Sequence, residues 1–119
     1  MKHLLLLALA LAATALVAGD ATGTWTGTMT VVSGDTYPAR MVLKQEGDTL
    51  TGTAGPDENQ QRPIKNAKVD HGVVTFEVPT EHAVMKFSLK QNEDDMSGEV
   101  TRELDGRTET AKVSVKRVK

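Results

Sequence analysis

The sequence predicts an all-β protein, an eight-stranded antiparallel up-and-down (meander) β-barrel that follows an N-terminal signal peptide. Three observations lead to this fold class. Apolar and polar residues alternate with a period of two along most of the chain after residue 22, as in half-buried strands. Turn-forming residues divide this region into short pieces, and the connections are too short for parallel crossovers. Outside the N-terminal leader, no window carries an apolar stripe with helical spacing.

The leader, residues 1–18, has the composition of a secretory signal peptide. Its first three residues are basic in character, the rest carry no charge, and small residues follow at Ala18, Gly19 and Ala21. The apolar run would form about 22 Å of helix, which is short of the ~30 Å hydrocarbon core of a bilayer. We therefore predict cleavage between residues 18 and 21, export to the periplasm or cell exterior, and no stable membrane insertion after cleavage. A retained membrane anchor is the alternative.

The remaining domain spans residues 22–118. Its first half predicts four strands with inward-facing apolar residues at every second position. In the first strand, Trp25, Gly27 and Met29 alternate with threonines. Clusters of Gly, Asp, Ser and Pro end each strand, because these residues favour turns. The expected strands are 22–32, 37–46, 48–55 and 62–70, with turns at 33–35 and 46–48 and a long loop that begins at 55–59.

The second half continues the same pattern. Met85, Phe87 and Leu89 alternate with lysine and serine, so one face of that strand is expected to be buried. The expected strands are 73–79, 82–91, 95–104 and 107–118, separated by turns at 70–72, 79–81, 92–94 and 104–106. Eight hairpin-linked strands can form a sandwich or a closed barrel, and we predict the barrel because closure removes exposed sheet edges.

An internal repeat supports this interpretation. Residues 41–54 resemble residues 87–100, which lie 46 positions later in the chain. The identities are Leu43, Lys44, Gln45, Asp48 and Gly52, which recur as Leu89, Lys90, Gln91, Asp94 and Gly98. The second strand of each unit reads apolar-x-Gly-x-apolar, and Trp25 to Met29 is a third copy around Gly27. We expect these inward-facing glycines to let the strands bend at barrel corners.

Gly23-Thr24-Trp25 opens the first predicted strand and resembles the Gly-x-Trp motif of lipocalins and related calycin barrels. The wider pattern, including Gly72 to Phe76, resembles small exported bacterial lipocalin-like domains of uncharacterised function. The resemblance implies that Trp25 plugs one barrel end and that an arginine packs across its ring. Arg117 is the first candidate for that arginine and Arg102 is the second. The chain is shorter than true lipocalins, so a shallower barrel is expected.

Composition excludes several classes of function. The absence of cysteine excludes disulfides, thiol catalysis and thiolate metal sites. Lys and Arg number 14 against 16 Asp and Glu, so no basic excess is available for nucleic acid. His71 and His82 fall at opposite ends of one predicted strand, so we expect neither a metal site nor a cofactor. No serine lies in a nucleophile motif. We therefore assign no catalytic residue, and a hydrolase would need a constellation that sequence order hides.

The predicted barrel interior is the remaining candidate site. We expect a non-enzymatic binding module for a small apolar ligand, which Tyr37, Met41, Phe76, Met85 and Phe87 would contact. The alternative use of the methionines is to fill a core that has few aromatic residues. In that case the core would be solid, and the protein would be a protein-interaction barrel, such as a protease inhibitor or envelope accessory domain. The loop from Gly55 to Arg62 would then recognise the protein partner.

Overall fold

The structure, a computed structural model, describes residues 20–119, which form nine β-strands and no helix. The predicted signal peptide, residues 1–18, lies outside the described residues. The strands are β1 (Gly23–Val31), β2 (Thr36–Glu46), β3 (Thr49–Gly55), β4 (Arg62–Pro63), β5 (Lys65–Asp70), β6 (Val73–Pro79), β7 (Val84–Asn92), β8 (Asp95–Leu104) and β9 (Arg107–Arg117). Within residues 20–119 there is accordingly no helix of the length and apolarity needed to cross a membrane.

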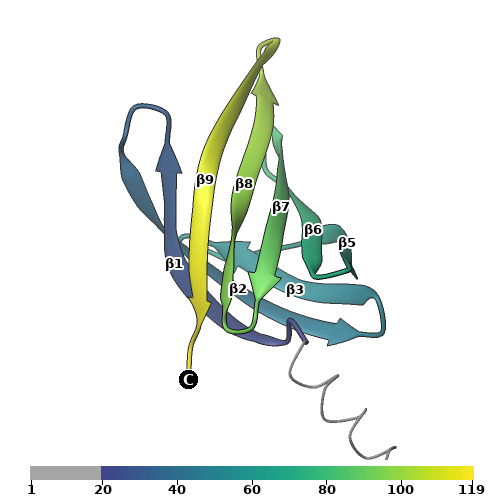
Figure 1. The fold of residues 1–119 in the computed structure, drawn as a ribbon. Coiled ribbons are helices and arrows are strands. Elements are labelled where there is room, and N and C mark those ends of the chain that lie inside the picture. The colour runs from purple at the N-terminus through teal and green to yellow at the C-terminus, as the bar shows by residue number, and fades with distance from the viewer. Residues whose placement is uncertain (1–19) are drawn as a thin grey trace, which may run out of the picture.

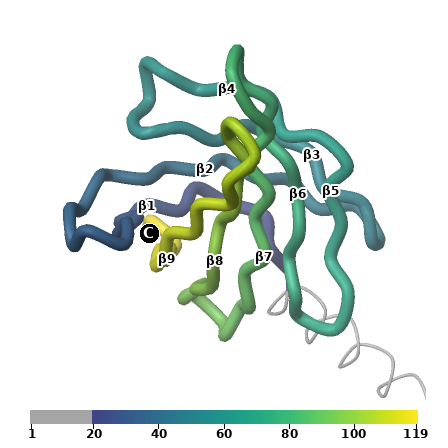
Figure 2. The backbone as a smooth tube through the Cα atoms, turned by 90° about the horizontal axis from the view of Figure 1, so that it is seen from above, coloured from purple at the N-terminus to yellow at the C-terminus, as the bar shows by residue number. Residues whose placement is uncertain are grey.

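The strands form one closed antiparallel barrel (Figure 1). Their order is β2-β1-β9-β8-β7-β6-β5-β3-β4, and an additional pairing of β2 with β3 closes the ring, which Figure 2 shows from above. The predicted up-and-down barrel is therefore confirmed. Pairing β1 with both β2 and β9 joins the two ends of the domain and removes the open edge that a flat sheet would expose.

The fourth predicted strand, 62–70, differs from the expectation because it is interrupted. β4 and β5 both pair with β3 and share one position around the barrel, so nine segments make eight strand positions. Between them Ile64 is buried, and Asn66, near the start of β5, has a φ of 49°. The register with β6 shifts between Lys65 and Lys68, as expected for a β-bulge. The period-two pattern alone did not predict this break.

The three glycines of the repeated motif bring neighbouring strands into close contact. A Cβ atom on Gly52 would overlap the carbonyl oxygen of Val42, and one on Gly98 would overlap that of Ser88. Gly27 has the same relation to Ser114. Each glycine thus lies directly against the backbone of the next strand, where any side chain would force the two strands apart.

Trp25 closes one end of the barrel. Its side chain is fully buried, its Nε1 donates a hydrogen bond to the Ala21 carbonyl at 3.0 Å, and the Arg117 guanidinium lies 4.5 Å from the ring centroid. Gly23 leaves room for the Arg117 side chain, and Arg117 is also paired with Asp94 at 2.8 Å. This arrangement is the cation–π contact that the resemblance implied for Arg117.

Arg102 does not take part in this closure. Its Nε lies 2.7 Å from Glu109 Oε1, near the hairpin that joins β8 to β9. That hairpin projects from the opposite end of the barrel (Figure 1). Of the two candidate arginines, Arg117 is therefore the one that packs on Trp25. Both arginines have inward parity, but parity does not specify the position along the barrel axis.

Candidate functional site

The end of the barrel opposite Trp25 contains a pocket of about 670 Å³. Its floor is buried and apolar, made of Met41, Ala54, Val78 and Val113. These residues come from β2, β3, β6 and β9, so the pocket occupies the interior of the barrel itself. A volume of several hundred Å³ is the usual size of a small-molecule site.

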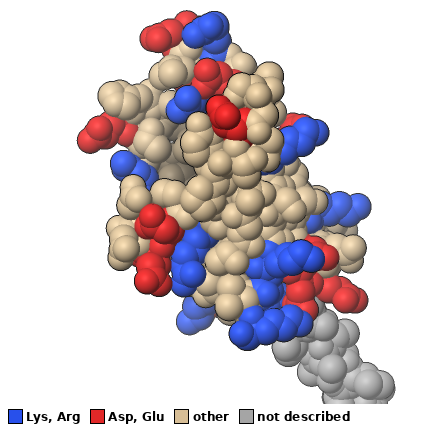
Figure 3. Space-filling model, turned by 90° about the vertical axis from the view of Figure 1, so that its left-hand side faces the viewer, with Lys and Arg blue, Asp and Glu red and all other residues tan. Residues whose placement is uncertain are grey.

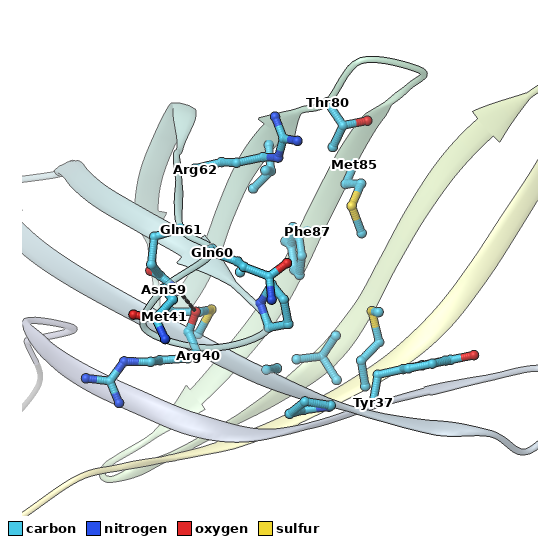
Figure 4. A pocket seen from close by; sticks show the side chains of 18 residues that line it. Tyr37, Arg40, Met41, Asn59, Gln60, Gln61, Arg62, Thr80, Met85 and Phe87 are labelled. Carbon is cyan, nitrogen blue, oxygen red and sulfur yellow. Dashed lines mark hydrogen bonds between the residues drawn. The ribbon is translucent and has the colours of Figure 1, made fainter.

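The upper wall of the pocket is also apolar but only partly buried. Met29, Met85 and Phe87 pack against the core while retaining exposure to the pocket. In Figure 4, Met85 and Phe87 project toward the space above Met41. Thioether side chains adapt readily to irregular apolar shapes, so this wall can accommodate an apolar molecule without a fixed outline.

Four of the five predicted contact residues line this pocket: Tyr37, Met41, Met85 and Phe87. Tyr37 is 47% exposed and stands at the rim. Phe76, the fifth residue, is buried behind the wall, where its ring stacks on Phe87 with centroids 4.7 Å apart and planes inclined by 17°. Phe76 therefore holds the Phe87 ring in place and does not itself face the pocket.

The long loop between β3 and β4 forms a polar side of the same pocket. Gln61 fixes the loop: its Nε2 donates to the carbonyls of Arg40 and Asp57, and its Oε1 accepts from Thr53 Oγ1. This network presents Asn59, Gln60 and Arg62 at the pocket, and in Figure 4 the Arg62 side chain extends toward Thr80. In the sequence analysis this loop had a role only in the alternative of a protein-interaction barrel, so these residues were missed as part of the pocket. The run of amide side chains was the available signal.

A second pocket of about 750 Å³ adjoins the first one, and both are lined by Met29, Tyr37 and Met85. It lies between the tips of the β1–β2 and β8–β9 hairpins. Its wall combines apolar residues such as Val100 with the Arg102–Glu109 ion pair. The open end of the barrel is therefore a two-part site whose halves meet at Tyr37.

Most charged side chains lie on the outer face of the barrel. Lys116 lies 3.3 Å from Asp95 and Lys112 lies 3.9 Å from Glu99 on neighbouring strands. Figure 3 shows residues of both signs interspersed on one side of the molecule. The first pocket, by contrast, is lined by no His, Asp or Glu residue, and its charged lining residues are Arg40 and Arg62. Among residues 20–119, no three His, Cys, Asp or Glu side chains are grouped as metal ligands.

Comparisons with known proteins give no relative for this chain: no protein-family model matches it, and neither a curated protein nor a solved structure does.

Proposed function

We propose that this protein is an exported, non-enzymatic binding module that takes up a small apolar molecule in the open end of its barrel. The observation that carries the proposal is the pocket of about 670 Å³ with an apolar floor and an apolar, partly buried wall. Burial of apolar ligand surface there would supply the binding free energy, at roughly 25 cal/mol per Å² removed from water. The lipocalin-like resemblance of Gly23-Thr24-Trp25 and the barrel architecture support the same function.

The pocket favours this function over a protein-interaction barrel with a solid core. A solid core would use Met29, Met85 and Phe87 as filling, which would bury these side chains completely. Instead, each of them keeps partial exposure at the pocket wall. In the alternative of a protein-interaction barrel, the loop from Gly55 to Arg62 would bind the protein partner. Because this loop contributes one side of the pocket, ligand binding also gives it a role.

The test compares two substitutions on the same strand. Ala39 is partly buried and lines the pocket, whereas Val42 lies on the outer face of β2 and is 40% exposed. Ala39→Phe would fill the pocket, and Val42→Phe adds a ring to the outside. The probe is N-phenyl-1-naphthylamine, an uncharged aromatic dye whose fluorescence rises in apolar sites. We expect Ala39→Phe to weaken dye binding by roughly tenfold or more, or about 1.4 kcal/mol, and Val42→Phe to leave it unchanged.

Native mass spectrometry of the protein purified from its own host is the second measurement. A small molecule retained by the wild-type protein and lost from Ala39→Phe would support the proposal. Dye that binds both variants and the wild-type protein equally, together with no retained molecule, would overturn it. Thermal unfolding of both variants shows whether each remains folded at the temperature of the binding assay.

A further inference from the structure

The N-terminal segment, defined here as residues 20–22, is an integral part of the closed barrel end. Ala21 is fully buried, and its carbonyl accepts the hydrogen bond of Trp25 Nε1. Asp20 Oδ1 accepts from both the backbone N–H and the hydroxyl of Thr22, at 2.7 and 2.6 Å. The segment therefore has a defined conformation and supplies the only partner that the indole N–H has among residues 20–119.

Two side chains from the internal repeat hold this segment. Gln45 Oε1 accepts from the Ala21 N–H at 2.8 Å, and Gln91 Nε2 donates to the Asp20 carbonyl at 3.1 Å. The side-chain Nε2 of each glutamine also donates to the backbone carbonyl two residues later in the chain. Gln45 donates to Gly47, and Gln91 donates to Glu93. The repeated glutamine thus performs one task twice, because Gln45 and Gln91 each close a turn and bind the N-terminal segment.

Arg117 fixes the segment from a third side. Its Nη2 donates to the Asp20 carbonyl at 3.0 Å, and its Nη1 donates to the Thr22 carbonyl. The same guanidinium packs on Trp25 and pairs with Asp94. Removing Asp20 and Ala21 would leave the buried Trp25 Nε1 without its acceptor and would cost Gln45 and Gln91 one hydrogen bond each. An unpartnered buried donor such as the indole N–H is costly.

We propose that removal of the leader leaves Asp20 and Ala21 in the mature protein, so that cleavage occurs on the N-terminal side of Asp20. This inference rests on the proposed export and sharpens it. The small-x-small pattern alone favours a cut after Ala21, because Gly19 and Ala21 would occupy its two small positions. The hydrogen bonds favour the earlier cut, because only that product retains the acceptor for Trp25.

The amide of Gln91 has a fixed orientation at the N-terminal segment. Gln91 Oε1 has no donor among the described residues, although the Nε2 of the same amide reaches the Asp20 carbonyl. Both Nε2 contacts of Gln91 are to carbonyl oxygens, so the orientation of the amide is fixed and its oxygen cannot exchange places with the nitrogen.

The direct test is to express the full chain with its own leader in a bacterial host and to determine the N-terminal sequence of the exported product. A first residue at or before Asp20 supports the proposal. A product that starts at Thr22 overturns it and leaves export intact. A chain that is never cut overturns the proposed cleavage and with it the proposed export by a removable leader, so the two failures are distinguishable.

A second test compares purified chains made to begin at Asp20 and at Thr22. We expect the Thr22 chain to melt about 10 °C lower, because several hydrogen bonds are lost and each kcal/mol shifts Tm by several degrees in a domain of this size. Gln45→Ala should lower Tm more in the Asp20 chain than in the Thr22 chain, whereas Gln60→Ala at the open end should have the same small effect in both. Equal Tm values for the two chains would overturn the proposal.

Discussion

The two ends of the barrel are built from the same strands but differ in how their inner positions are filled. At the closed end, Trp25, Leu89 and Met96 are at most 1% exposed. At the open end, Met29, Met85 and Phe87 are only partly buried and line pockets. The polar contacts differ in the same way, since Arg117 joins three chain segments, whereas Tyr37 stands exposed at the rim.

This difference separates two properties of the barrel: which side chains face inward, and whether those side chains fill the interior. Alternation determines which side chains face inward, and in β7 it continues along the whole strand. Whether the interior is then filled depends on side chains that cross the barrel end. Trp25 and the N-terminal segment fill one end, and no comparable group covers the other among the described residues. We expect stability to depend on the closed end and binding to depend on the open end.

The largest expected effect is that of Trp25→Ala. Removing a fully buried indole leaves a large cavity and an unpaired Ala21 carbonyl, so the free energy of unfolding should fall by about 3–5 kcal/mol. Tyr37→Ala at the open rim removes an aromatic ring that is 47% exposed and should cost below about 1 kcal/mol. Denaturant unfolding measures both. Similar losses for the two variants would contradict the division between the ends.

Arg117→Ala should have the next largest effect, a loss of about 2–3 kcal/mol. The variant removes a charge-assisted hydrogen bond to Asp94 and the contact with the Trp25 ring. Arg117→Lys keeps the charge but cannot reproduce the planar fork of donors, so it should recover only part of the loss. If the lysine variant unfolded at the wild-type denaturant concentration, charge alone would account for this contact.

Two methionines on neighbouring strands give a matched comparison between the ends. Met96 on β8 is 1% exposed, and Met85 on β7 is partly buried at the pockets. Met96→Ala should lower the free energy of unfolding by about 2–4 kcal/mol, and Met85→Ala by about 1 kcal/mol. The order should reverse for dye affinity, which only Met85→Ala should reduce. A larger stability loss for Met85→Ala would indicate that the open end is packed.

The smallest expected effect is a pH dependence from Asp94. Hydrogen bonds from Lys119 and Arg117 hold the pKa of Asp94 below its usual value of 3.8. The ionised carboxylate therefore stabilises the fold at neutral pH, and this contribution is lost as the pH falls through the lowered pKa. Asp94→Asn should flatten the acid limb of a plot of Tm against pH. An unchanged acid limb would show that other carboxylates dominate it.

The sequence allowed most of the fold to be predicted. Strand bounds agree to within about two residues because the period of two and the Gly, Asp and Pro turns are local signals. The break at Ile64 and Asn66 was not predicted, because it arises from the register between β5 and β6. The role of Gln45 and Gln91 was visible only as a repeated identity, since their shared target lies in a distant segment.

The candidate site was predictable to a lesser degree. Inward parity correctly brought Tyr37, Met41, Met85 and Phe87 to one pocket, because these residues lie on strands whose open-end positions coincide. Parity could not show that Phe76 is screened by Phe87 or that Arg102 lies away from Trp25. The positions of Phe76 and Arg102 depend on the stagger between neighbouring strands, which cannot be inferred from the sequence of one strand alone.

The pairing of β1 with β9 has a consequence for the timing of folding. Trp25 lies opposite Arg117, so the first strand can pair at once with β2 but finds its second partner only when the last strand is available. Such distant pairings make folding slow, and a chain that lacks the last strand should be unable to close the barrel. A chain that ends before Arg107 is therefore expected to be degraded rapidly by added protease, while the whole domain resists it.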